Sequence, residues 1–159
     1  MVCLKIAFIC TGNTCRSIMA QALAGQILGE IGDIGNDIQV ISAGLMVYPG
    51  SPASENAREV MALLGIDISS HMARPFTDAI AREADLILTM TAAHKRVLSG
   101  NYPRLGEKLY TLAEYAGNGK ADVTDPFGQS FEVYRESAGE IRELVEKVIH
   151  KILQQGNGN

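Results

Sequence analysis

Two short segments made almost entirely of apolar residues restrict the fold of this chain more than any other feature. They are LKIAFIC at residues 4–10 and ADLILTM at residues 84–90. Neither segment alternates apolar with polar side chains, so a strand formed by either one must be buried on both faces. Because helical patterns separate the two segments, the sequence predicts a parallel sheet with helices packed on both of its faces.

The remaining elements follow the same alternation. Right-handed connections between them predict a single doubly wound α/β domain over residues 1–155, built on a four-stranded parallel sheet. Residues 156–159 are expected to form a frayed tail. Pro52 is expected in the first turn of the second helix and Ser130 at the N-cap of the last. The expected helices are 16–31, 51–66, 91–99 and 130–155, and the two further strands are 38–44 and 108–112.

The composition and charge of the chain argue against several classes of function. The chain has 159 residues, a net charge of −4 and scattered basic residues, which argues against a nucleic-acid partner. No apolar stretch approaches the roughly 20 residues of a membrane helix and no signal peptide is evident, so we expect no membrane association and a cytoplasmic location. Three cysteines do not form a disulfide framework, and their spacing lacks the partners of a zinc site. We therefore expect thiol chemistry without a metal or cofactor.

The segment CTGNTCRS, residues 10–17, is where such chemistry fits. It joins the first strand to the first helix, and ligands of doubly wound sheets bind at this edge. Gly12 and Asn13 favour positive φ, which lets successive N–H groups curl into a nest for an oxyanion and stabilise a thiolate at Cys10. Arg16 offers a planar fork for two phosphate oxygens, and Ser17 a hydroxyl for the sulfur. The alternative is a buried, inert cysteine in an ordinary turn.

A thiol nucleophile that takes up a phosphoryl group also needs an acid for the leaving group. The best candidate is Asp125 in DVTDPFGQS, because the following proline holds it outside helical geometry. An ordinary Asp-Pro turn is the alternative. Phe127 is expected as a pocket wall, while Tyr48 fits either a pocket border or the solvent edge. His94 and His150 are expected to be surface or helix-end residues.

Five segments together resemble the low-molecular-weight protein tyrosine phosphatases: FICTGNTCRS, SAG at 42–44, HMAR at 71–74, ADLILTM and DPFGQS. The resemblance implies two-step, metal-independent hydrolysis of phosphorylated protein substrates through a phosphocysteine. It makes Cys10 the nucleophile, Arg16 the phosphate clamp and Asp125 the general acid and then base. It also implies that Asn13 and Ser17 support the loop and that Ser42 and His71 lie behind it. Substrate is expected to contact the loop residues Thr11, Gly12, Asn13, Thr14, Cys15 and Ser17.

Thr14 indicates the branch of the family. Tyrosine-specific members have leucine or isoleucine there, and paired aromatics where this chain has Phe127 and Gly128. Thr14 and DPFGQS, with MTAAHK and LAEY, are similar to the protein-arginine-phosphatase branch. Ile18 replaces a usual proline of the family, a change expected to affect only local rigidity. Phosphoarginine is therefore the expected substrate.

Three other functions are weighed against this one. Phosphotyrosine hydrolysis uses the same chemistry. Arsenate reductases have a similar loop, but they relay oxidation to later cysteines, and this chain has none after Cys15. A non-catalytic phosphate-binding module would not need Cys10, Arg16 and Asp125 together. Capture of oxidised Cys10 as a disulfide with Cys15 is a further possibility, against which Cys15 is simply a packed core residue.

Overall fold

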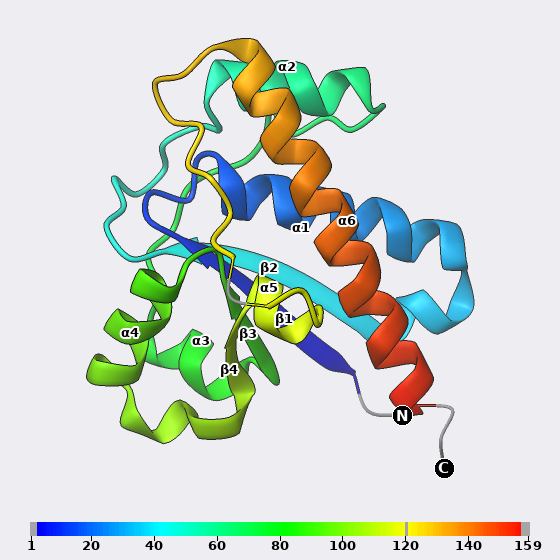
Figure 1. The fold of residues 1–159 in the computed structure, drawn as a ribbon, viewed down its shortest axis with the longest axis vertical. Coiled ribbons are helices and arrows are strands. Elements are labelled where there is room, and N and C mark those ends of the chain that lie inside the picture. The colour runs from blue at the N-terminus through cyan, green and yellow to red at the C-terminus, as the bar shows by residue number, and fades with distance from the viewer. Residues whose placement is uncertain (1–2, 120, 157–159) are drawn as a thin grey trace.

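A computed structural model of the chain describes residues 3–119 and 121–156. Four strands form one parallel sheet in the order β2-β1-β3-β4, as Figure 1 shows. This confirms the predicted four-stranded parallel sheet of a doubly wound domain. The strands are β1 (Leu4–Cys10), β2 (Ile38–Gly44), β3 (Leu86–Thr89) and β4 (Leu109–Thr111).

Six α-helices and two short 3-10 helices connect the strands in the described part of the chain. Four of the α-helices correspond to predicted ones, whereas α3, α5 and both 3-10 helices were not predicted. The α-helices are α1 (Arg16–Ile31), α2 (Glu55–Leu63), α3 (Asp78–Glu83), α4 (Ala92–Asn101), α5 (Leu112–Tyr115) and α6 (Phe131–Gly156). The 3-10 helices are η1 (Asp33–Asp37) and η2 (Pro103–Lys108).

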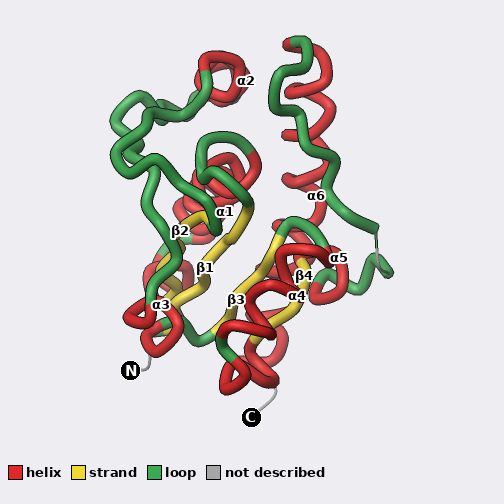
Figure 2. The backbone as a smooth tube through the Cα atoms, turned by 90° about the vertical axis from the view of Figure 1, so that its left-hand side faces the viewer, coloured by secondary structure: helices red, strands yellow, loops and turns green. Residues whose placement is uncertain are grey.

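Both faces of the sheet are buried, as its apolar strands predict. Ile6 and Phe8 of β1 face a core that includes α1, α2 and α6, while Ala7 and Ile9 face a second core with α3 and α4. Figure 2 shows the sheet between these helices. Side chains of one strand point alternately to opposite faces, so the same apolar run supplies both cores.

The long helix α6 packs along α1 and α2. Its predicted apolar face is buried at Ile141, Leu144, Val145, Val148 and Ile149, and Ile152 packs at the edge of the same core. Gly156 is the last helical residue, so the expected tail does not begin there. The rest of that tail, 157–159, lies outside the described residues.

The second helix begins later than predicted. It starts at Glu55, because the Ser54 hydroxyl accepts a hydrogen bond from Ala57 N and caps the helix. Pro52 lies before the helix and not in its first turn. The backbone N–H of Ser54 donates to the Thr14 carbonyl, 2.9 Å away. The segment before α2 is thus fixed against the loop that follows β1.

The carboxyl ends of the strands lie at one edge of the sheet. Cys10 pairs with Gly44, Ile9 with Thr89, and Thr89 with Thr111. Since all four strands are parallel, the loops that leave them converge at this edge. This places the CTGNTCRS segment where a ligand site is expected.

Candidate active site

Cys10 lies at the end of β1 with its sulfur at the base of the loop. The residue is only 3% exposed. Its Sγ lies 2.9 Å from Ser17 Oγ and accepts a hydrogen bond of 3.3 Å from the backbone N–H of Asn13. The side-chain amide of Asn13 donates to Ser17 Oγ at 2.8 Å, which leaves the Ser17 proton for the sulfur. Two donors are thus aimed at one sulfur.

The loop curls at Asn13, the one described non-glycine residue with positive φ, at 58°. Gly12 does not have positive φ, so the prediction that both residues adopt it is wrong for Gly12. Asparagine tolerates this conformation better than most residues, and here its side chain is also tied down. One left-handed residue is enough to turn the backbone.

Three residues from two other segments hold Asn13 in place. Its side-chain amide donates to Ser42 Oγ at 2.9 Å, and its Oδ1 accepts from Arg74 N at 3.0 Å. His71 Nε2 donates to the Asn13 carbonyl at 2.7 Å, since a carbonyl oxygen only accepts. Ser42 in turn donates to Gln21 Oε1 at 2.6 Å. Ser42 and His71 therefore lie behind the loop, where the resemblance places them.

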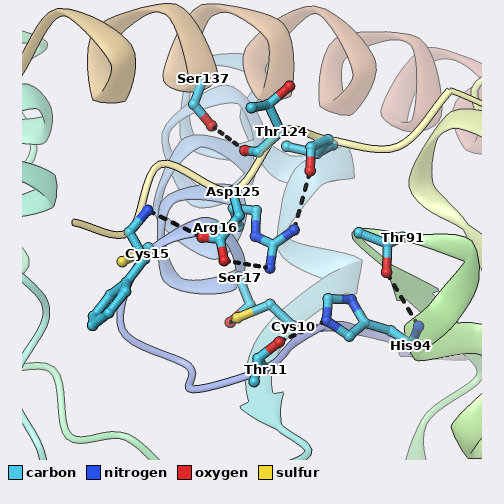
Figure 3. A network of polar contacts seen from close by, with 12 residues as sticks. Cys10, Thr11, Cys15, Arg16, Ser17, Thr91, His94, Thr124, Asp125 and Ser137 are labelled. Atoms are coloured by element: carbon cyan, nitrogen blue, oxygen red, sulfur yellow. Dashed lines mark hydrogen bonds and ion pairs between the residues drawn. The ribbon is translucent and has the colours of Figure 1, made fainter. Parts of the chain in front are cut away.

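Arg16 joins the loop to the segment that carries Asp125. The arginine is 5% exposed and donates from Nη1 to the Val123 carbonyl at 3.1 Å. Its Nη2 lies 3.5 Å from Asp125 Oδ2, and the carboxylate side chain is 53% exposed. Asp125 Oδ1 accepts from the backbone N–H of Phe127 at 3.1 Å. Figure 3 shows Arg16 between the loop and Asp125.

These groups surround a cavity of about 310 Å³. Its floor holds Cys10 and Arg16, and Asp125 lies on its wall. Large exposed side chains form part of its rim: Met46, Tyr48 and Phe127. Both aromatic candidates thus border the cavity, and Met46 joins them without a sequence signal. The other lining residues are Thr11, Gly12, Thr14, Cys15 and Ser51.

Cys15 directs its sulfur toward the core helix α6. The Sγ donates to Ser54 Oγ at 3.5 Å and lies 3.2 Å from the Tyr134 hydroxyl. Burial and the contact with Cys15 raise the pKa of Tyr134 to about 12, which keeps its hydroxyl protonated and able to donate to the sulfur. This packing fits the structural alternative for Cys15. Disulfide formation with Cys10 stays a prediction.

Among the residues discussed from the sequence, His94 differs most from its predicted environment. It lies at a helix end as expected, in the first turn of α4, but it is buried at 7% exposure and not on the surface. Its Nε2 lies 2.8 Å from Thr11 Oγ1. Burial, and next the nearby Arg16 cation, lower the pKa of His94 to about 4, so its ring is neutral near pH 7.

No helix in residues 3–119 and 121–156 is long and apolar enough to cross a bilayer. No group of three or more His, Cys, Asp or Glu side chains within those ranges is arranged to hold a metal ion. Chemistry without a metal or cofactor stays a prediction.

The family follows from comparison with known proteins. A sequence profile described as low molecular weight phosphotyrosine protein phosphatase matches residues 5–157. The chain belongs to this family. The resemblance read from its five motifs is therefore confirmed.

Relatives named as arginine phosphatases and relatives named as tyrosine phosphatases have similar sequence identity to this chain. A protein-arginine-phosphatase of Bacillus subtilis is 36% identical over 149 residues, which is 94% of this chain and 97% of the relative. A YwlE arginine phosphatase mutant with a phosphorylated active-site serine superimposes with a TM-score of 0.89 at 35% identity, covering 94% of this chain and 95% of that one. A low molecular weight protein tyrosine phosphatase from T. tengcongensis gives 0.87 at 40% identity, with 93% and 99% covered.

Proposed function

We propose that the protein is a cysteine-dependent phosphatase that removes phosphoryl groups from arginine side chains of proteins. The observation that carries the chemistry is the Cys10 sulfur, which accepts from Ser17 and Asn13 on the floor of a cavity that also exposes Arg16 and Asp125. Each member of this set has a defined part in phosphoryl transfer.

In the first step the Cys10 thiolate attacks phosphorus and forms a phosphocysteine. The bond from phosphorus to the leaving nitrogen breaks, and its electron pair takes a proton from the Asp125 carboxylic acid. Arg16 and the N–H groups of the loop bind the phosphoryl oxygens, whose charge they stabilise in the transition state. The half-exposed Asp125 is placed to reach a leaving group at the cavity mouth.

In the second step water hydrolyses the phosphocysteine. The Asp125 carboxylate, now without its proton, takes one from the attacking water. The water oxygen bonds to phosphorus while the bond to sulfur breaks, which releases phosphate and returns the Cys10 thiolate. Ser17 donates to this sulfur and makes it a better leaving group.

Thr14 supports arginine as the substrate. It lines the cavity and is half-buried, and its Oγ1 lies 3.7 Å from Cys15 Sγ, to which it can donate while it accepts from the group attached to phosphorus. A guanidinium presents N–H donors that a hydroxyl can accept, and an aliphatic side chain would leave these donors unpaired, at a cost of roughly 1 to 3 kcal/mol each. The names of the arginine-phosphatase relatives agree with this assignment. Phosphotyrosine stays the second candidate, since relatives named for it are similarly close.

The biological setting follows from the same proposal. The substrates are phosphorylated proteins, as the names of the relatives indicate. The exposed rim of Met46, Tyr48 and Phe127 offers apolar contact to a peptide around the phosphorylated residue. We place the enzyme in the cytoplasm, where reduced thiols are maintained.

Hydrolysis of matched phosphoarginine and phosphotyrosine peptides, measured side by side, tests the assignment. We expect the parent to prefer phosphoarginine. Thr14→Ile is expected to shift the ratio of kcat/KM toward phosphotyrosine by at least about tenfold, or roughly 1.4 kcal/mol.

Two matched variants separate the hydroxyl from the added bulk. Thr14→Ser keeps the hydroxyl and should keep the preference for phosphoarginine. Thr14→Val removes the hydroxyl at similar side-chain volume and should lose most of that preference. A parent that prefers phosphotyrosine, or a ratio unmoved by Thr14→Ile, transfers the assignment to tyrosine. Turnover by Cys10→Ser at the parent rate would remove the proposed nucleophile altogether.

A further inference from the structure

His94 is a buried residue with an unused nitrogen beside the proposed active site. Its Nδ1 has no hydrogen-bond partner among the described residues, while its Nε2 lies 2.8 Å from Thr11 Oγ1. Thr11 directly follows the nucleophile and lines the cavity. Figure 3 shows His94 reaching from α4 to Thr11, next to Cys10.

The unpaired nitrogen indicates which atom carries the proton. A neutral imidazole has one N–H donor and one acceptor. Buried N–H groups without a partner are rarer than unpaired acceptors, because an unmade donor bond is costly. The proton therefore belongs on Nε2, which then donates to Thr11 Oγ1.

This direction has a consequence for Thr11. When its oxygen accepts from His94, its own proton points elsewhere, and no described residue accepts it. The side chain lies on the cavity wall beside Cys10, and phosphoryl oxygens are acceptors. We propose that His94 is a positioning residue, which holds the Thr11 hydroxyl as a donor to the phosphoryl group of the substrate.

The surroundings of His94 are built to hold it still. Thr91 caps α4 and accepts from the backbone N–H of His94 at 3.1 Å. Asp122, the first residue of the DVTDPFGQS segment that carries Asp125, accepts from Ala92 N at 2.9 Å. The first turn of α4 is thus tied to the segment of Asp125 as well as to the phosphate loop. The low pKa of His94, caused by burial and by Arg16, keeps the ring neutral as this donor arrangement requires.

The inference rests on the proposed function, but its test does not require turnover. Affinity for inorganic phosphate is measured by calorimetry in the parent and in variants. Thr11→Val and His94→Leu are each expected to weaken phosphate binding about three- to tenfold. The double variant should lose no more than the larger single loss, because both changes remove the same hydrogen bond to phosphate.

Conservative and distant variants serve as controls. Thr11→Ser and His94→Gln keep a hydroxyl and a side-chain donor, so both should bind phosphate more nearly like the parent. His150→Gln changes an exposed histidine on α6 and should not alter binding. Nitrogen NMR of the parent should show the proton of His94 on Nε2.

Two results overturn the inference: a proton on Nδ1, or unchanged phosphate affinity in a folded Thr11→Val protein. Thr11→Val keeps the volume of the side chain, so it carries the test even if His94→Leu does not fold. If phosphate binding follows the expected pattern but no phosphorylated substrate is hydrolysed, the proposed function fails while the role of His94 stands.

Discussion

Several polar side chains at this site are buried and are held in place by an ion pair or a hydrogen bond. Arg16 is nearly buried, yet both of its outer nitrogens have partners on the segment of Val123 and Asp125. Burial of an arginine is favourable only when its donors are paired. In the proposed mechanism, the oxygens of an entering phosphoryl group compete with Asp125 for Arg16. We expect this competition to free the Asp125 carboxyl group to act on the leaving group.

Asp125→Ala is expected to lower kcat/KM by about 100-fold or more on a phosphopeptide with a basic leaving group. On an aryl phosphate whose leaving group departs without a proton, the loss should be at least about tenfold smaller. Steady-state kinetics on both substrates check this. Glu132→Ala, which changes an exposed carboxylate in the first turn of α6, is the control and should alter neither. Equal losses on both substrates would show that Asp125 acts only by holding Arg16.

Site residues that stand in short motifs could be predicted from the sequence, but the burial of individual side chains could not. Cys10, Arg16 and Asp125 stand in short motifs, and the fold brings them to one cavity. His94 stands in MTAAHK within the third predicted helix, but that motif assigned it no part in the site. Its contact with Thr11 joins residues 83 apart in sequence, and no local pattern encodes a contact of that range.

At the scale of elements, the site depends on how closely β2 approaches the phosphate loop. Gly44 ends β2 opposite Cys10. A Cβ added at Gly44 would lie 2.5 Å from the Thr11 carbonyl oxygen and 3.0 Å from Asn13 N. Those are backbone atoms of the loop, so they cannot move aside without changing its shape. The glycine of the SAG segment thus permits a close approach that any side chain would prevent.

Gly44→Ala is therefore expected to lower the free energy of unfolding by about 1 to 3 kcal/mol. It should also weaken phosphate binding, because the loop must shift. Denaturant unfolding and phosphate titration measure the two effects. Gly139→Ala is the control: nothing lies within 4 Å of the added carbon in α6, and alanine there should stabilise the helix by about 0.5 to 1 kcal/mol. A Gly44→Ala protein as stable and as tight for phosphate as the parent would contradict this packing.

The sequence predicted long elements better than short ones, for physical reasons. The strand 4–10 and the helix 16–31 have the predicted bounds, because apolar pattern and loop chemistry agree there. The helices α3 and α5 have six and four residues, too few for a helical period to appear. The helix α2 begins later than predicted because Ser54, and not Ser51, caps it. Ser54 is held at this position by the hydrogen bond from its backbone N–H to the Thr14 carbonyl.

For the whole molecule, the two cores hold the site from opposite faces of the sheet. The core with α1, α2 and α6 fixes the phosphate loop through α1, which begins at Arg16. The α4 side carries His94 to the same loop from the other direction. Global stability is therefore coupled to the protonation of a residue at the site, because charging His94 must disturb its burial.

The pH dependence of unfolding tests this coupling. The pKa of His94 is lowered from 6.5 in the unfolded chain to about 4 in the folded protein. Between these values the unfolded chain binds more protons, so stability is complete above about pH 6.5 and falls as the pH drops toward 4. The full loss amounts to about 3 kcal/mol. Urea unfolding at pH 7 and pH 4.5 measures most of it.

Comparison with His94→Gln isolates the contribution of this one group. Burial, and next Glu143, raise the pKa of Glu140, which acts in the opposite direction above its usual value of 4.5, but parent and variant share that carboxyl group. The pKa of Glu114 is lowered, so Glu114 affects stability only below its usual value of 4.5, and parent and variant share this group as well. The difference between the two proteins should therefore shrink toward acid pH by about 2 to 3 kcal/mol, since glutamine does not titrate. His150→Gln should run parallel to the parent. If His94→Gln also runs parallel to the parent, His94 takes up a proton as readily in the folded protein as in the unfolded chain, and the coupling of its burial to stability is wrong.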